Sequence, residues 1–254
     1  MYLTRFRVNT ARPGARRLLS SPQSLHAAVM TSFPGLLPTA ADSPRVLWRL
    51  DHNARAEVFL YVVSPARPDL THMVEQAGWP AAALDPETPG WQSRPYGPFL
   101  DRLTTGDTWA FRLTANPVHS IRRKDGEPTK RTAHRTPVHQ QGWLLERQER
   151  SGFRIVEKPA DRRLLPAGTT HKGHPHPGDA YELSVRDPRG LSFAKSHEGT
   201  AGRERVTVVT VTFDGRLEVT DPEALRRTLV QGLGKAKAYG CGLMTLAPLP
   251  APAG

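Results

Sequence analysis

Residues 206–246 read VTVVTVTFDGRLEVTDPEALRRTLVQGLGKAKAYGCGLMTL, and they carry the strongest succession of secondary-structure signals in the chain. Residues 206–213 consist of valine and threonine with a final phenylalanine, and such a run of β-branched residues predicts a strand. The pair Asp214-Gly215 favours a tight turn between two strands. A second strand is therefore expected over residues 216–219.

A helix and a glycine-rich segment follow these strands. Asp221 is a preferred helix cap and a proline follows it, so we expect a helix over residues 222–231. Residues 232–243 then hold four glycines, two lysines and a tyrosine, and a last strand is expected over 243–246. Glycine permits left-handed backbone and close approach to another molecule. Exposed backbone N–H groups beside lysines suit a phosphate-bearing ligand, and the candidate ligand-binding residues are Gly232, Gly234, Lys235 and Lys237.

Two familiar phosphate-binding motifs do not fit this segment. A P-loop needs the spacing G-x-x-x-x-G-K-[ST], and no Ser or Thr follows Lys235. The dinucleotide fingerprint opens a helix, whereas these glycines follow one. The segment is therefore interpreted as a contact for a polyphosphate backbone, with a purely structural turn as the alternative.

The composition points to nucleic acid. The 254 residues include 35 Lys and Arg against 24 Asp and Glu, for a net charge of +11. A domain this basic commonly binds nucleic acid or an anionic membrane. No apolar run has the length of a membrane span and no signal peptide is apparent, so we expect no membrane partner. The single Cys241 excludes an internal disulfide and fits the cytoplasm.

The remaining signals repeat one order of elements twice. The first half is expected to hold a strand at 2–9, a helix starting at Pro22 behind the cap Ser21, strands at 46–50 and 56–63 around a turn at Asp51–Asn53, a helix at 68–77 and a strand at 91–96. The second half adds a strand at 107–115, a helix at 137–150 and a strand at 153–157 before the elements described above.

Two β-α-β-β-α-β units predict an α+β fold of two tandem ferredoxin-like (RRM-like) domains, at residues 1–104 and 105–254. Many RNA-binding modules share this plan. The candidate strands lack the aromatic signatures of an RNP motif, which argues against recognition by base stacking.

Several motifs occur in the order found in one known family. They are the opening Met-Tyr-Leu-Thr-Arg, Ser21-Pro-Gln-Ser-Leu-His26, Val46-Leu-Trp-Arg-Leu50, Phe111-Arg-Leu-Thr-Ala-Asn-Pro117 and the segment from Gly232 to Pro248. In this order they resemble the CasE-type endoribonucleases of the type I-E CRISPR Cascade complex, within the RAMP superfamily. The resemblance extends over both halves of the chain.

The resemblance implies a function and partners. Family members cut a CRISPR repeat hairpin RNA without metal, leave a 2′,3′-cyclic phosphate and a 5′-hydroxyl, and keep the mature crRNA as Cascade subunits. The expected partners are therefore the repeat hairpin, the crRNA and other Cascade subunits, chiefly the backbone subunit. No metal and no cofactor are expected.

His26 is the expected catalytic residue. Cleavage by the RNA 2′-hydroxyl needs a base, an acid for the leaving 5′-oxygen and cations for the charge on phosphorus. Histidine titrates near neutrality, and His26 matches the family's active-site histidine. Some relatives carry a tyrosine where this chain has Gln23, and an amide cannot transfer a proton. Either another group substitutes, or His26 works alone and more slowly.

A basic stretch, Arg122-Arg-Lys-Asp-Gly-Glu-Pro-Thr-Lys-Arg131, predicts a β-hairpin around Asp125-Gly126. By resemblance it lies along the groove of the RNA stem, where arginine contacts phosphate and guanine in bidentate fashion. A solvated charged loop is the alternative. The candidate RNA-binding residues here are Arg122, Arg123, Lys124, Lys130 and Arg131.

Other polar clusters are interpreted as loops. His171, His174 and His176 lie among prolines and glycines without ligand spacing, which favours an exposed loop over a metal site. Residues 186–189 and 195–205 are expected to be insertion loops.

Two function classes remain open. The first is a hairpin-specific, metal-independent endoribonuclease that stays on its product. The alternative is an RNA-hairpin-binding scaffold subunit with weak or no catalysis. Gln23 favours the second class and His26 the first.

Overall fold

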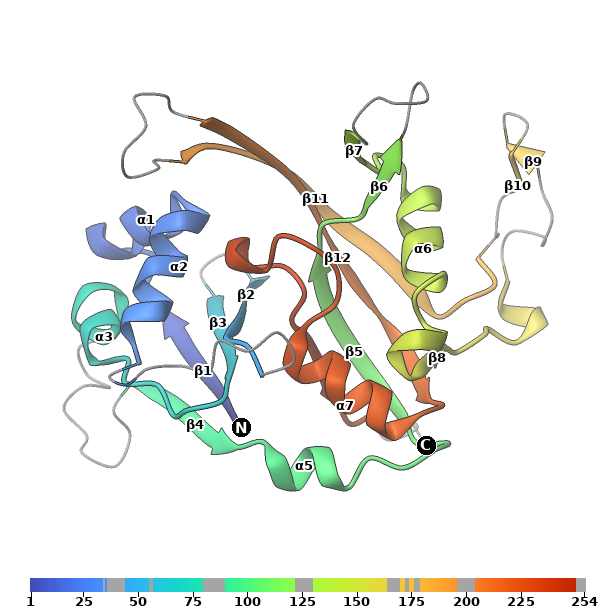
Figure 1. Cartoon of the computed structure of the whole chain (residues 1–254), viewed down its shortest axis with the longest axis horizontal. Coiled ribbons are helices and arrows are strands. Elements are labelled where there is room, and N and C mark those ends of the chain that lie inside the picture. The colour runs from blue at the N-terminus through green and yellow to red at the C-terminus, as the bar shows by residue number, and fades with distance from the viewer. Residues whose placement is uncertain are drawn as a thin grey trace. The chain divides into compact units, whose positions relative to one another are not determined.

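The chain forms two packed units, one built from Met1–Arg102 with Leu229–Leu243 and the other from Leu103–Thr228 with Met244–Gly254. The computed structural model (Figure 1) describes residues 1–33, 35, 44–54, 57–79, 90–121, 130–163, 170–171, 174–175, 179–195 and 204–249. The predicted domain limits, 1–104 and 105–254, stay a prediction. The glycine-rich segment, residues 232–243, packs as part of the first unit.

The first unit is a four-stranded antiparallel sheet with helices. Its elements are β1 (Tyr2–Val8), α1 (Pro13–Leu19), α2 (Pro22–Thr31), β2 (Leu47–Ala54), β3 (Glu57–Ser64), α3 (Thr71–Ala77), β4 (Trp91–Pro95), α5 (Gly97–Asp101) and the short helix η3 (Lys237–Tyr239). The strands lie in the order β2-β3-β1-β4. This is the order of a ferredoxin-like sheet, in which the first and third strands pair at the centre.

One apolar core joins the sheet of this unit to its helices. Alternate residues of β1 are buried, because successive side chains of a strand point to opposite faces. Helices α2 and α3 bury residues at helical spacing against that face. The core includes Phe6, Val8, Leu25, Val29, Trp48, Leu60, Val62, Leu70 and Met73.

The second unit repeats the plan with an enlarged sheet. Its elements are β5 (Thr108–Ala115), β6 (Val118–Ile121), β7 (Lys130–Ala133), α6 (Pro137–Leu145), η1 (Glu149–Ser151), β8 (Phe153–Ile155), η2 (Ala160–Arg162), β9 (Thr170–His171), β10 (His174–Pro175), β11 (Leu183–Lys195), β12 (Glu204–Val219), α7 (Pro222–Gln231) and β13 (Met244–Ala247). The main sheet has the order β11-β12-β5-β13, and β8 also pairs with β12. With β8 and β11 sharing the second-strand position, the order is again ferredoxin-like. The predicted fold class is confirmed.

One predicted turn in the second unit is wrong. Residues 204–219 form one continuous strand, β12, which pairs with β5 through Asp214 and Gly215. Asp214 stays in the strand and forms no turn, because its carboxylate accepts hydrogen bonds from Arg112 and Arg186. Gly215 is needed for close approach: a Cβ there would overlap the carbonyl oxygen of Glu182.

Two further local predictions are corrected. The turn expected at Asp51–Asn53 lies inside strand β2, which continues to Ala54. Residues 186–189, expected as a loop, form an irregularity within β11, where the register shifts and Asp187 has a φ of 51°. Strand β11 ends at Lys195, and β12 begins at Glu204. Residues 196–203 lie outside the described part of the chain.

The helix expected at 137–150 is shorter than predicted, since α6 ends at Leu145 and a separate 3-10 turn follows. Helices α1 and α5 were not expected from the sequence. Within the ranges given above, no helix is both long enough and apolar enough to cross a membrane.

We expect Gly215→Ala to lower the free energy of unfolding by about 1–3 kcal/mol, because the added methyl must displace backbone. Urea denaturation measures the loss. Gly190→Ala is the matched control on the neighbouring strand β11, since a Cβ there meets no atom within 4 Å. Equal behaviour of the two variants would contradict the assignment of Gly215 to a close strand contact.

Candidate functional site

His26 lies on α2, a helix whose start follows the predicted signals. The Ser21 hydroxyl accepts a hydrogen bond from the Ser24 N–H at 3.4 Å, and Pro22 occupies the first turn. Leu25 and Val29 are buried, so this face of the helix packs on the sheet. His26 follows Leu25 in the chain and is only partly buried.

Among the described residues, the His26 ring has a polar partner on β2. The indole Nε1–H of Trp48 donates to His26 Nδ1 at 3.3 Å. Burial lowers the pKa of His26 below its ordinary value. The histidine therefore stays neutral to a lower pH than a free histidine does.

The glycine-rich segment, residues 232–243, is folded through left-handed backbone. Gly232, Gly234, Gly240 and Gly242 have φ values of 78°, 85°, 80° and 92°. This conformation favours glycine, as the sequence predicted. Ala236 adopts it as well, with a φ of 62°.

Two of these glycines are also required by packing on β2. A Cβ at Gly240 would approach the Trp48 ring to 2.7 Å, and one at Gly232 would approach the Leu47 side chain to 2.8 Å. The short helix η3 contacts both α2 and β2. The segment thus lies against the strand that carries Trp48, within the same unit as His26.

Part of the segment's hydrogen-bonding capacity is used internally. The N–H of Leu233 donates to the carbonyl of Gly242 at 2.9 Å, and the N–H of Tyr239 donates to the carbonyl of Ala236 at 2.9 Å. These groups hold the segment's own shape. The structural alternative considered for the glycines therefore has direct support, while phosphate binding stays a prediction.

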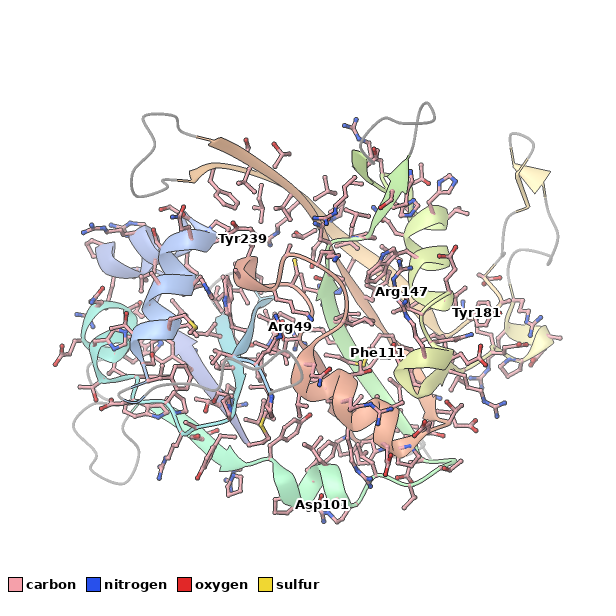
Figure 2. All side chains as sticks on the ribbon, in the orientation of Figure 1. Arg49, Asp101, Phe111, Arg147, Tyr181 and Tyr239 are labelled. Carbon is pink, nitrogen blue, oxygen red and sulfur yellow. The ribbon has the colours of Figure 1, made fainter. Side chains whose placement is uncertain are left out.

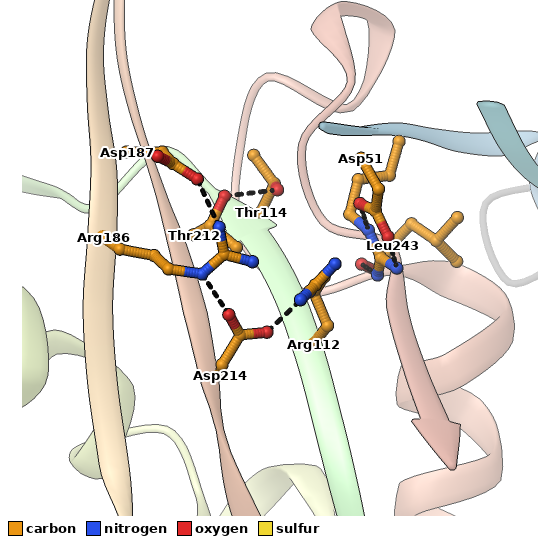
Figure 3. Close-up of polar contacts among 9 residues, drawn as sticks. Asp51, Arg112, Thr114, Arg186, Asp187, Thr212, Asp214 and Leu243 are labelled. Atoms are coloured by element: carbon orange, nitrogen blue, oxygen red, sulfur yellow. Dashed lines mark hydrogen bonds and ion pairs between the residues drawn. The ribbon is translucent and has the colours of Figure 1, made fainter. Parts of the chain in front are cut away.

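The buried Arg49 side chain, labelled in Figure 2, secures the segment to β2, and Figure 3 shows Asp51 and Leu243 where it is bonded. Arg49 and Asp51 lie two residues apart on the strand and are joined by bonds of 2.7 and 2.9 Å. The Arg49 Nη1 group also donates to the carbonyl oxygen of Leu243 at 3.0 Å. Arg49 is 1% exposed, so its charge is compensated inside the protein.

Three cations gather around the glycine-rich segment. Lys235 is exposed and Lys237 is partly buried. Burial lowers the pKa of Lys237, and the charges of Arg45 and Lys235 lower it further. An anion placed here would relieve this repulsion. Arg45 was missed by sequence reasoning, since it stands alone before β2 without a charge run.

Gln23 is exposed on the first turn of α2. It lies on the same helix as His26, as predicted. Its amide cannot transfer a proton.

The basic hairpin belongs to the second unit. Strands β6 and β7 pair antiparallel, with Ser120 opposite Arg131 and Ile121 opposite Lys130. Arg131 is exposed. Arg122, Arg123 and Lys124 lie outside the described residues, so their role stays a prediction.

Three histidines meet at the base of this hairpin, a cluster that sequence reasoning missed. The rings of His119 and His134 have centroids 4.3 Å apart, and those of His134 and His139 are 5.9 Å apart. Burial and the neighbouring histidines lower the pKa of His134, and Arg147 adds to this while Glu146 opposes it. The three histidines do not form a motif of regular sequence spacing, so nothing in the sequence alone indicates that their rings meet.

Two of the three histidines interpreted as an exposed loop lie in a short strand pair, in which His171 is opposite His174. His176 falls outside the described residues. Among the side chains that the structure does describe, no group of three or more His, Cys, Asp or Glu is arranged to hold a metal ion.

A polar network lies on the sheet of the second unit (Figure 3). The Asp214 carboxylate accepts from Arg112 Nε at 2.6 Å and from Arg186 Nε, and Arg186 also pairs with Asp187 at 2.6 Å. Thr114 and Thr212 are bonded across the same strand pair at 3.0 Å. The two arginines are thus fixed by carboxylates within the sheet.

The chain is similar to proteins of one known family. A family model described as "CRISPR associated protein" matches residues 1–248. The chain is 30% identical over 249 residues to the CRISPR-associated endoribonuclease Cse3 of Thermus thermophilus, which spans 98% of this chain and 100% of the relative. It is 44% identical over 152 residues to the CRISPR system Cascade subunit CasE of Escherichia coli, which spans 58% of this chain and 62% of the relative.

Solved structures agree with this result. Cse3 endoribonuclease bound to a 19-nucleotide RNA aligns with a TM-score of 0.70 at 27% identity, covering 98% of this chain and 100% of that chain. A Thermus thermophilus Cse3 complex with an RNA representing a pre-cleavage state aligns with a TM-score of 0.64 at 28% identity, covering 97% and 98%.

Removing the buried arginine should destabilise the protein strongly. Arg49→Met removes the arginine that pairs with the buried Asp51 carboxylate, and we expect a loss of about 3–5 kcal/mol in the free energy of unfolding, measured by urea denaturation. Arg227→Ala is the control: it removes one partner of the exposed pair with Glu223, which should cost less than about 1 kcal/mol. A small loss for Arg49→Met would contradict the central role of this pair.

Proposed function

Because the chain belongs to the family of CRISPR-associated proteins whose model matches residues 1–248, we propose that it is an endoribonuclease that cleaves CRISPR precursor RNA within its repeat hairpin. It does so by attack of the RNA 2′-hydroxyl on the adjacent phosphorus, without metal. The products carry a 2′,3′-cyclic phosphate and a 5′-hydroxyl.

The observation that carries the proposal is the arrangement in the first unit. A part-buried histidine, His26, has one nitrogen engaged by Trp48, and the cation-bearing glycine segment contacts the same helix and strand. RNA cleavage by its own 2′-hydroxyl needs proton transfer and positive charge near one phosphate. This unit supplies both kinds of group.

The relatives support the reaction type. The relative that covers the whole chain is named an endoribonuclease, and its solved complexes contain RNA, one of them in a pre-cleavage state. This chain keeps His26 at the position that the family resemblance assigns to the active-site histidine. Lys235 and Lys237 are proposed to stabilise the charge that develops on phosphorus, with Gly232 and Gly234 shaping the segment that presents them.

RNA recognition is assigned to the second unit. Strand β7 begins with Lys130 and Arg131, and Arg122, Arg123 and Lys124 follow β6 in the sequence. We assign these side chains to the RNA stem because arginine contacts phosphates and guanine edges in bidentate geometry. The net charge of +11 supports association with a polyanion.

The proposed partners follow from the same relatives. One relative is named a Cascade subunit, so we assign this chain to a Cascade complex in which it keeps the mature crRNA and contacts chiefly the backbone subunit. The compartment is the cytoplasm, where both the precursor RNA and a reduced Cys241 would be found.

Gln23 supports a second candidate function. It is exposed at the start of α2, and its amide cannot transfer a proton. A chain that binds the hairpin as a Cascade subunit but cleaves weakly or not at all would fit this residue. Cleavage by the wild-type protein decides between the two functions.

We expect His26→Ala to slow single-turnover cleavage of the repeat RNA by roughly 10²–10⁴-fold, the size of a lost acid–base group. Hairpin affinity, measured by filter binding, should change little. Gln23→Ala on the same helix is the control and should cleave at nearly the wild-type rate. Unchanged cleavage by His26→Ala would remove this residue from the mechanism, and absence of cleavage by the wild type with intact binding would favour the scaffold function.

The chemistry of attack by the 2′-hydroxyl predicts the product ends. Cleavage should continue in excess EDTA, and the 5′ fragment should end in a 2′,3′-cyclic phosphate, as mass spectrometry can show. A requirement for Mg²⁺ or a fragment ending in a free 3′-hydroxyl would instead indicate metal-assisted hydrolysis.

A further inference from the structure

Trp48 has a contact that bears directly on the chemistry of His26. Its indole Nε1 lies 3.3 Å from His26 Nδ1, and an indole nitrogen only donates hydrogen bonds. His26 Nδ1 must therefore be the acceptor. A neutral imidazole that accepts at Nδ1 carries its proton on Nε2.

The Trp48 ring is held firmly enough to impose this choice. It is 2% exposed and belongs to the apolar core of the first unit. Gly240 lies against its six-membered ring, so closely that a Cβ there would approach to 2.7 Å. The backbone at Gly240, which is left-handed, lies directly against the indole and leaves it no room to move in that direction.

We propose that Trp48 is a positioning residue that fixes His26 with its proton on Nε2 and makes it a hydrogen-bond donor to the departing 5′-oxygen. This inference rests on the proposed endoribonuclease function. It narrows the role of His26, which the sequence left as acid or base.

The tautomer disfavours the opposite role. For Nε2 to accept the proton of the 2′-hydroxyl, the imidazole proton would have to sit on Nδ1, where it would face the N–H of Trp48. A protonated ring meets the same conflict, and the burial that lowers the pKa of His26 acts in the same direction. A neutral imidazole N–H is a competent electrophilic donor in enzymes whose histidine pKa is lowered.

In the proposed site we assign the Nε2–H of His26 to the departing oxygen. The phosphoryl oxygens can be met by the cations of the glycine segment, Lys235 and Lys237. In the cleavage step the 2′-oxygen bonds to phosphorus and loses its proton to solvent. The bond from phosphorus to the 5′-oxygen breaks with its electron pair on that oxygen, which Nε2–H stabilises until water protonates it. One proton is released and one is taken up.

Nitrogen NMR of the RNA-free protein labelled with ¹⁵N-histidine tests the tautomer without any activity. The His26 signals, identified by their loss in His26→Ala, should show a protonated Nε2 and an unprotonated Nδ1 at neutral pH. A protonated Nδ1 in the wild-type protein would overturn the proposal, and this result needs no variant of Trp48.

Trp48→Phe removes the N–H and keeps a ring against Gly240. We expect the His26 tautomers to become mixed and the His26 pKa to rise, because the neutral form loses its bonded partner. Trp91→Phe is the matched control in the same unit, since Trp91 Nε1 has no hydrogen-bond partner among the described residues. Equal spectra for wild type and Trp48→Phe would show that the contact does not set the tautomer.

Kinetics with two RNAs tests the role. On natural repeat RNA, Trp48→Phe should cleave roughly 3- to 10-fold more slowly, the effect of one neutral hydrogen bond, and His26→Ala should be slower still. On RNA with sulfur in place of the 5′-oxygen at the cleaved linkage, the leaving group needs no donor. Both variants should then approach the wild-type rate.

The outcomes separate this inference from the proposed function. If both variants stay slow on the sulfur-containing RNA, His26 does not assist the leaving oxygen and the inference fails while the endoribonuclease stands. If the wild type cleaves neither RNA, the proposed function fails, and the donor role of His26 fails with it. Hairpin affinity of each variant confirms that it is folded.

Discussion

The buried arginine of β2 is the interaction on which the first unit depends. Arg49 bonds to Asp51 on its own strand and to the carbonyl of Leu243. It therefore links the second strand of the sheet to a segment almost two hundred residues later in the chain. A buried guanidinium must have its donors satisfied, so the end of the glycine-rich segment is fixed wherever β2 is folded. The position of Gly240 against Trp48, and through Trp48 the state of His26, follows from this attachment.

This attachment changes how the glycines are understood. From the sequence they suited a phosphate, because glycine exposes backbone N–H groups and lysines stand beside them. In the structure Gly232 and Gly240 are first of all required by Leu47 and Trp48, and some of the N–H groups serve the segment itself. The two interpretations are compatible. A segment that is pressed onto β2 presents its lysines in a fixed place, and the repulsion among Lys235, Lys237 and Arg45 makes an anion there favourable.

The fold was largely predictable because its signals are local. Two ferredoxin-like units followed from the alternation in β1, the valine- and threonine-rich run of β12, the Ser21 and Asp221 caps and the order of elements. Errors arose where a local signal was overridden by a distant partner. Asp214-Gly215 has the composition of a turn, but two arginines hold the aspartate and the carbonyl of Glu182 occupies the space beside the glycine. Asp51 likewise belongs to a strand because Arg49 compensates its charge. His26 was found through family resemblance; neither its contact with Trp48 nor the His119–His134–His139 cluster has a signature in sequence spacing.

The His26 tautomer indicates what is lost when glutamine replaces tyrosine at position 23. If His26 donates from Nε2, the proposed site needs a further group as a base for the 2′-hydroxyl and not as a second acid. A phenol at the start of α2 would add another donor, whereas a lysine can accept a proton only in its neutral form, which a lowered pKa favours. Lys237 is partly buried and its pKa is lowered by burial, Arg45 and Lys235. Phosphate binding would raise that pKa again, so the same lysine would stabilise charge once the RNA is bound and would be a poor base. The reaction in this chain would then depend chiefly on placing the 2′-oxygen in line with the departing 5′-oxygen. Rate gains from orientation alone can be large, and they require a rigid hairpin contact more than a second proton-transfer residue.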